Sequence, residues 1–219
     1  SSLENLRDLN RLIGNATHGE IPAVVGRGNH DTRGKYAEKV IDYMATNDGR
    51  AYFSFSAGQV WGMVFDCGED KLDDHPEYRS LNYFEKYRKD ELAFLRRTKP
   101  EDKTFRFAVC HVPFMSSVAM CGIFDIMPDL YRKWGKEADR MGFEFMLCGH
   151  THKTQYIAPG DESDKFCHSY PVIVGVTRTD DYLSGCAVQL KKSGSVMRFV
   201  GSDGKVSPLY GITDGKEIK

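Results

Sequence analysis

Apolar positions recur along the N-terminal part of the chain in two patterns, and each pattern predicts an element. Residues 1–16 carry leucine or isoleucine at positions 3, 6, 9, 12 and 13, which is the spacing of one helix face. Ser1 and Glu4 fit a capping box at the start of that helix, and Gly14 is a typical stop. The run "IPAVV" at 21–25 then predicts a short buried strand.

The middle of the chain predicts a hairpin, two helices and two further strands. The segments "AYFSFS" and "QVWGMVFD" flank Ala57-Gly58, as in a β-hairpin. Residues 81–97 place Leu81, Phe84, Leu92 and Leu95 on one side of a helix, and 129–141 predict a second helix. Strands are predicted at "FRFAVC" and "FEFMLC".

The last third of the chain alternates apolar runs with turn residues. We predict strands at "QYIA", "YPVIVGV", "GCAVQL" and "VMRFV", with "SDG" at a hairpin turn. There is no repeat and no stretch with linker composition, which favours a single domain over residues 1–219. Strand–helix alternation followed by consecutive strands predicts an α/β fold with an added antiparallel part.

Composition adds little beyond excluding some partners. The 219 residues are 41% hydrophobic and 28% charged, as in ordinary globular proteins, and the net charge is -1. This balance gives no strong nucleic-acid signal and no attraction to an anionic membrane. No run approaches the ~20 apolar residues of a membrane span. The sequence shows no signal peptide, and the localisation stays open.

The six cysteines form no C-x-x-C pair, so a zinc ribbon or a thioredoxin-like motif is not indicated. A chain of this length can build a core without disulfides. We therefore expect buried free thiols, at the following positions: Cys67, Cys110, Cys121, Cys148, Cys167 and Cys186.

Polar side chains follow three of the predicted strands. Asn29 and His30 follow "IPAVV", His111 follows "FAVC", and His150 and His152 follow "FMLC". Because sites in α/β sheets gather at the carboxyl ends of the strands, we expect these groups to meet there. Imidazoles and an amide oxygen are ligands for Zn, Mn or Fe.

Each of these motifs alone also fits a simple turn, and a lone histidine is more often structural than a ligand. Their occurrence together, each after a strand, favours a metal site. In an extended segment His150 and His152 would start on the same face, because they are two residues apart. His18, His75 and His168 are expected at the surface.

The ordered series "GNHD" (28–31), "CHVPF" with His111, and "GHTH" (149–152) resembles the calcineurin-like metallophosphoesterases. The resemblance covers about residues 1–155. It implies a four-layer α/β/β/α sandwich with two metals between the sheets. Metallo-β-lactamases also use an H-x-H pattern, but "HTHKTQ" lacks the Asp and His that follow in theirs.

The resemblance also implies roles for individual residues. Asn29, His111 and His150 would bind one metal, and His152 would bind the other. His30 would stand over the substrate and protonate the leaving oxygen as a general acid. The cofactor would be two divalent transition metal ions (Mn, Fe or Zn), and a metal-bridging hydroxide would attack a phosphate ester, either a monoester or a diester.

Two flanking residues, Asp31 and Arg27, are expected to support the turn through hydrogen bonds or a surface ion pair.

Two other family motifs, Asp-x-His and Gly-Asp-x-x-Asp/Asn, do not precede residue 28. The stretches 73–75 and 160–164 match them by letter, as in a circular permutation, but both lie in polar surroundings and are interpreted as solvated loops.

The sequence therefore predicts a metallophosphoesterase domain over 1–219 that lacks its first strands and is incomplete at the N-terminus. The full-length protein would hydrolyse a small phosphate-ester substrate, and this chain alone would be weak or inactive. The alternatives are a non-catalytic scaffold or interaction protein with the same fold, and a nuclease of the same family. Candidate walls of a substrate pocket are residues 113–128 and the acidic "GEDKLDD" stretch at 68–74.

Overall fold

The fold is built on a six-stranded sheet in the order β1-β2-β3-β4-β6-β5. The computed structural model describes residues 2–44, 46–114, 128–162, 164 and 168–218. The strands of this sheet are β1 (Phe53–Ala57), β2 (Val60–Phe65), β3 (Phe105–Cys110), β4 (Phe145–Cys148), β5 (Gln155–Ile157) and β6 (Val172–Val174).

The four central strands are parallel, and the edge strands β1 and β5 are antiparallel to their neighbours. The register pairs Phe65 with Cys110, Cys110 with Cys148, and Cys148 with Val174. The carboxyl ends of these strands therefore lie at the same edge, and the loops that follow them are brought side by side.

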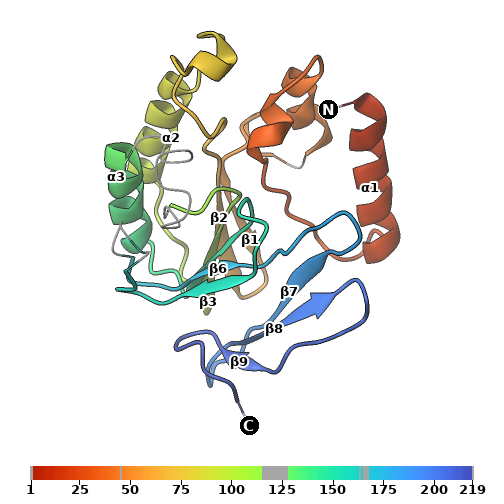
Figure 1. The fold of residues 1–219 in the computed structure, drawn as a ribbon. Helices are drawn as coiled ribbons and strands as arrows, with labels where there is room; N and C mark the ends of the chain where they lie inside the picture. Colours follow the sequence, from red (N-terminus) through yellow and green to blue (C-terminus); the bar gives the residue numbers. More distant parts are fainter. Residues whose placement is uncertain (1, 45, 115–127, 163, 165–167, 219) are drawn as a thin grey trace.

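A second, three-stranded antiparallel sheet packs on one face of the first (Figure 1). It consists of β7 (Ser184–Gln189), β8 (Val196–Gly201) and β9 (Tyr210–Gly211). Phe145 and Ile173 of the large sheet share an apolar cluster with Met197 of β8 and with Ile212, and all four are buried. Burial of these facing apolar side chains joins the two sheets.

Two helices cover the other face of the large sheet, namely α2 (Glu85–Arg97) and α3 (Pro128–Asp139). Leu92 and Leu95 of α2 and Trp134 of α3 belong to the same buried cluster as the sheet residues. Helix α1 (Leu3–Thr17) lies on the opposite side of the molecule (Figure 1). The predicted α/β/β/α sandwich is therefore confirmed as a fold class.

Three short 3₁₀ helices complete the described elements: η1 (Asn29–Thr32), η2 (Ala37–Tyr43) and η3 (Pro76–Tyr78). Asn10 of α1 donates a hydrogen bond to the Tyr43 carbonyl at 3.0 Å, which joins α1 to η2. Within the described residues, no helix combines the length and apolarity needed to cross a bilayer.

The predicted hairpin is confirmed, because β1 and β2 are antiparallel neighbours on either side of the predicted turn. The predicted ends of the first helix are wrong. Its N-cap is Ser2, whose hydroxyl accepts from the Asn5 amide at 3.1 Å. The helix continues through Gly14 to Thr17, because a glycine inside a helix weakens it by only about 1 kcal/mol.

The predicted start of the helix at residue 81 is also wrong, since α2 begins at Glu85. Leu81 lies before the helix and is 85% exposed. The carboxylate of Asp73 accepts hydrogen bonds from the backbone amides of Phe84 and Glu85, each at 2.9 Å. Asp73, interpreted from sequence as part of a solvated loop, therefore caps this helix.

The predicted strand "IPAVV" does not form. Ile21 is 63% exposed and Val24 is 38% exposed. The segment pairs with none of the described strands, so its backbone belongs to no sheet. The chain instead passes over the sheet, where a side-chain carbon at Gly26 would lie 3.5 Å from Val109.

One histidine expected at the surface is buried instead. His168 is 3% exposed, and its Nδ1 lies 2.8 Å from a carboxylate oxygen of Asp164, which is 6% exposed. Asp164 belongs to the stretch interpreted as a solvated loop, so that interpretation is wrong for this residue. The pairing gives the His168 Nδ1 atom and the Asp164 carboxylate a hydrogen-bond partner inside the core.

The expectation of buried free thiols is confirmed for Cys67, Cys110 and Cys148. Cys186 is also free but only partly buried. Burial raises the pKa of the Cys186 thiol to about 11, which keeps it protonated. Cys121 and Cys167 lie outside the described residues, as does most of the 113–128 loop.

Candidate metal centre

The turn that carries Asn29 is held by its neighbours. The Gly28 amide donates to the Asp31 carboxylate at 2.9 Å, and the Asp31 amide donates to the Gly28 carbonyl at 3.0 Å. Arg27 pairs with Asp66, just after β2, at 2.6 Å. The predicted support by Asp31 and Arg27 is confirmed, although the Arg27 ion pair is buried and not at the surface. Asn29 itself is 1% exposed.

His111 follows the last residue of β3, and its ring lies between two glycines. A side-chain carbon at Gly28 would lie 3.3 Å from three ring atoms, and one at Gly149 would lie 3.4 Å from Nδ1. The Gly149 amide donates to the His111 carbonyl at 3.0 Å. The glycines of the two separate motifs therefore leave the space that this imidazole occupies.

His150 and His152 follow β4 in a bend and not in an extended segment. Their φ angles are +69° and +55°, in the left-handed region that non-glycine residues rarely adopt. The expectation of an extended segment with both side chains on one face is therefore wrong. Such backbone conformations cost of order 1 kcal/mol or more and are frequent at functional sites. Both residues still line one cavity.

Three side chains from three separate segments converge in this cavity. The His111 Nε2 atom lies 3.1 Å from Asn29 Oδ1 and 3.4 Å from His150 Nδ1. The two imidazole rings meet edge to face, with centroids 5.2 Å apart. Ligands held about 2.1 Å from one metal ion at tetrahedral or octahedral angles are about 3.0–3.4 Å apart. The observed spacings match that separation.

The donor set also fits a metal in its chemistry. Asn29 Nδ2 is buried and has no hydrogen-bond partner among the described residues. The oxygen of the same amide, Oδ1, contacts His111 Nε2. Within the described part of the chain, no group of three or more His, Cys, Asp or Glu side chains is placed to hold a metal ion. The three donors that meet here are two imidazole nitrogens and one amide oxygen.

The electrostatics of the site keep the two imidazoles neutral. Burial lowers the pKa of His111, and it lowers the pKa of His150 to about 4, with further contributions from neighbouring histidines. Neutral imidazole is the form that offers a lone pair to a metal. At neutral pH both rings are therefore available as ligands.

The cavity has a volume of about 490 Å³ and reaches beyond these three side chains. His30 and His152 are exposed at its wall. Asp70 also lines it, in agreement with the prediction that "GEDKLDD" contributes a wall. The sequence did not indicate Arg178, an exposed cation on the same wall, because no motif surrounds it.

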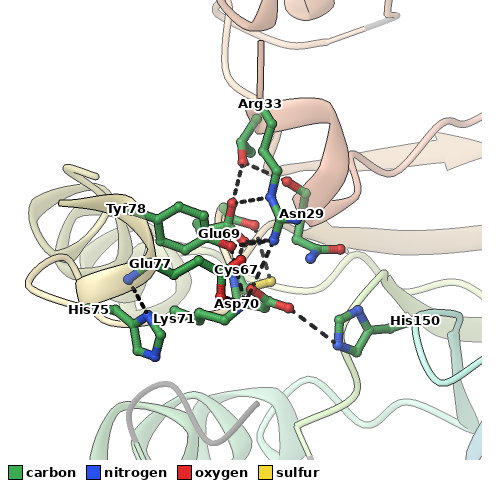
Figure 2. A network of polar contacts seen from close by, with 12 residues as sticks. Asn29, Arg33, Cys67, Glu69, Asp70, Lys71, His75, Glu77, Tyr78 and His150 are labelled. Atoms are coloured by element: carbon green, nitrogen blue, oxygen red, sulfur yellow. Dashed lines mark hydrogen bonds and ion pairs between the residues drawn. The ribbon is translucent and has the colours of Figure 1, made fainter. Parts of the chain in front are cut away.

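A network of buried charges borders the cavity (Figure 2). Arg33 donates two hydrogen bonds to the Glu69 carboxylate, each at 2.7 Å. Burial opposes ionisation of Glu69, but the Arg33 guanidinium outweighs it and lowers the pKa of that carboxyl to about 2. Burial and the adjacent Glu69 raise the pKa of Asp70, against the pull of Lys71.

Comparisons by sequence give no assignment. No description of a known protein family matches the chain, and no curated protein sequence matches it. Among the solved structures that share part of its shape are the following two. One is a purple acid phosphatase from yellow lupin (Lupinus luteus) seeds, with a TM-score of 0.48 and 15% identity over 84% of this chain. The other is GAP50, described as the anchor in the inner membrane complex of Plasmodium, with a TM-score of 0.42 and 17% identity over 77% of this chain.

The matched region is 37% of the lupin chain and 53% of the Plasmodium chain, so this chain spans less than two thirds of either. The two neighbours have different described roles, one as a phosphatase and one as an anchor. A function for this chain therefore has to be argued from its own residues.

Proposed function

We propose that the protein hydrolyses phosphate esters with metal ions held in the cavity beside η1, β3 and β4. The observation that carries the proposal is the convergence of Asn29 Oδ1, His111 Nε2 and His150 Nδ1 at ligand spacing. These residues come from the three motifs that resemble the calcineurin-like metallophosphoesterases. Divalent transition metals, such as Mn, Fe or Zn, suit this set of nitrogen and oxygen donors.

Each residue has one part in the proposed reaction. Asn29, His111 and His150 bind the first metal ion, and His152 binds the second. Metal ions bound by these residues would supply an activated water and would offset charge on the phosphoryl oxygens. His30, exposed on the cavity wall, donates a proton to the leaving oxygen of a small phosphate ester.

All three first-metal ligands are neutral, so they do not compensate the charge of a divalent ion. We therefore expect the chain to bind metal weakly and to hydrolyse slowly.

The test is calorimetric titration of the chain with Mn²⁺, followed by assays of p-nitrophenyl phosphate and bis-p-nitrophenyl phosphate hydrolysis. His111→Ala is expected to weaken Mn²⁺ binding at least about tenfold, because it removes the central donor of the three. His75→Ala is the matched control, since His75 lies before η3 and does not line the cavity.

Mn²⁺ binding that His111→Ala leaves unchanged would contradict the proposed site. Absence of Mn²⁺ and Zn²⁺ binding, with a folded protein, would contradict the proposed function and favour an interaction protein with this fold. Hydrolysis at an ordinary enzymatic rate by the chain alone would overturn the expectation of weak activity.

A further inference from the structure

The two ring nitrogens of His150 face different partners. Nδ1 points to His111, at 3.4 Å from its Nε2 atom, while Nε2 lies 3.9 Å from Asp70 Oδ2 (Figure 2). The side chains of His150 and Asp70 are 7% and 2% exposed. This distance is longer than a hydrogen bond, and a shift of about 1 Å closes it to one.

Asp70 is fixed in this position by its other carboxylate oxygen. Its Oδ1 atom accepts hydrogen bonds from Lys71 Nζ at 3.1 Å and from Arg33 Nη2 at 3.2 Å. The Asp70 amide donates to the Glu69 carboxylate at 2.8 Å. Two cations on one oxygen leave the second oxygen directed at the imidazole.

The same network reaches the turn that carries the first ligand. Arg33, which binds both Glu69 and Asp70, directly follows η1. Thr32 donates to the Asn29 carbonyl at 2.7 Å, and its hydroxyl lies 3.4 Å from the Glu69 carboxylate. The acidic pair at 69–70 therefore joins the Asn29 turn to the His150 bend.

A neutral imidazole carries a proton on one nitrogen only, so the partner of one nitrogen decides whether the other has a lone pair. A carboxylate that accepts from the outer nitrogen of a ligating histidine fixes both its tautomer and its ring orientation. His111 Nε2 lies within hydrogen-bond distance of Asn29 Oδ1 and can donate a proton to it. The contact between His111 Nε2 and His150 Nδ1 therefore does not require a proton on His150 Nδ1.

We propose that Asp70 is a positioning residue that accepts the Nε2 proton of His150 and so presents the Nδ1 lone pair to a metal ion. Asp70 acts through His150 and contacts no metal itself. The consequence for metal binding rests on the proposed function, whereas the tautomer of His150 does not, because it is a property of the metal-free protein.

The first experiment is a long-range ¹H–¹⁵N spectrum of the metal-free chain at pH 8, with His150 assigned by its loss in His150→Ala. We expect the Nε2–H tautomer in the unchanged protein and a mixture of both tautomers in Asp70→Leu. Asp70→Ala, which also removes the acceptor, serves as the second variant if the leucine protein does not fold. Glu77→Gln is the matched control, because Glu77 also pairs with Lys71, at 3.3 Å, but lies at the surface.

The second experiment titrates the same proteins with Co²⁺ and follows its visible absorption. Loss of an outer partner weakens metal binding by about 10- to 100-fold, and we expect this loss for the Asp70 variants and none for Glu77→Gln. An Nδ1–H tautomer in the unchanged protein, or a tautomer unaffected in every folded Asp70 variant, overturns the proposal.

The outcomes separate the two proposals. Co²⁺ binding that depends on His111 and His150 but is equal in the Asp70 variants overturns the positioning role and leaves the proposed function in place. A tautomer that depends on Asp70, in a chain that binds no Co²⁺, supports the contact with His150 and contradicts the proposed function.

Discussion

At the scale of single residues, the candidate site depends on the space around the His111 ring as well as on the ligands. The His111 ring fits between two backbone segments that have no side-chain carbon at their points of contact, Gly28 and Gly149. The backbone at Gly28 has φ -94°, which any residue can adopt. Its glycine is therefore required by the neighbouring imidazole and not by its own conformation.

We predict that Gly28→Ala displaces the His111 ring by a few tenths of an ångström and weakens Mn²⁺ binding severalfold. The reason is that the added carbon would stand 3.3 Å from three ring atoms. The measurement is calorimetric titration with Mn²⁺. Gly14→Ala is the control: it lies in α1 with open space around it, so metal binding stays unchanged and stability rises by about 0.5–1 kcal/mol. Equal Mn²⁺ affinity in both variants would contradict this account.

At the scale of elements, α2 takes its cap from a residue distant in sequence. The N-cap position is Phe84, whose side chain cannot accept a hydrogen bond. The two carboxylate oxygens of Asp73 accept from the Phe84 and Glu85 amides instead. The negative charge also lies at the positive end of the helix dipole. The acidic loop thus fixes the point at which α2 begins.

We predict that Asp73→Ala lowers the free energy of unfolding by about 1 kcal/mol, the usual effect of losing a helix cap. Asp73→Asn retains an acceptor oxygen and is expected to lose less. Urea denaturation measures both, with Asp74→Ala at the adjacent exposed position as the control. If Asp73→Ala and Asp74→Ala are equally stable, the capping role is wrong.

At the scale of the whole molecule, a buried polar cluster joins the helical layer to the sheet. Glu91 of α2 accepts a hydrogen bond from the Asp66 amide, just after β2, at 3.1 Å. Its Oε2 atom has no hydrogen-bond partner among the described residues. Burial, and then the Asp66 carboxylate, raise the pKa of Glu91 well above 4.5. Glu91 therefore keeps its proton in the folded protein at pH values where the unfolded chain has released it.

The difference in the pKa of Glu91 between the folded and the unfolded state makes the stability depend on pH. Unfolding releases a proton from Glu91 above pH 4.5, so its contribution to stability falls as the pH rises from 4.5 toward the folded pKa. We predict that Glu91→Gln, which has no proton to release, is more stable than the unchanged protein at pH 7 and that the difference disappears near pH 4. Urea denaturation at both pH values measures it, with exposed Glu38→Gln as the control. A lower stability of Glu91→Gln at pH 7 would refute the prediction.

The local patterns of the chain predicted most elements of the fold. The β1–β2 hairpin, β3, β4 and the three helices follow from apolar spacing and turn residues, because such patterns act over a few neighbouring residues. The motifs at 28–31, 111 and 149–152 predicted the candidate ligands. Their roles as ligands stay predictions.

Only the tertiary structure decided what depends on residues distant in sequence. "IPAVV" is not a strand because none of the described strands pairs with it, and His168 is buried because Asp164 and the core surround it. The contact of Asp70 with His150 joins loops that follow different strands. The sequence by itself determined local backbone preference and the order of the motifs. Pairing and burial were decided by the fold, because each requires a partner that no local pattern contains.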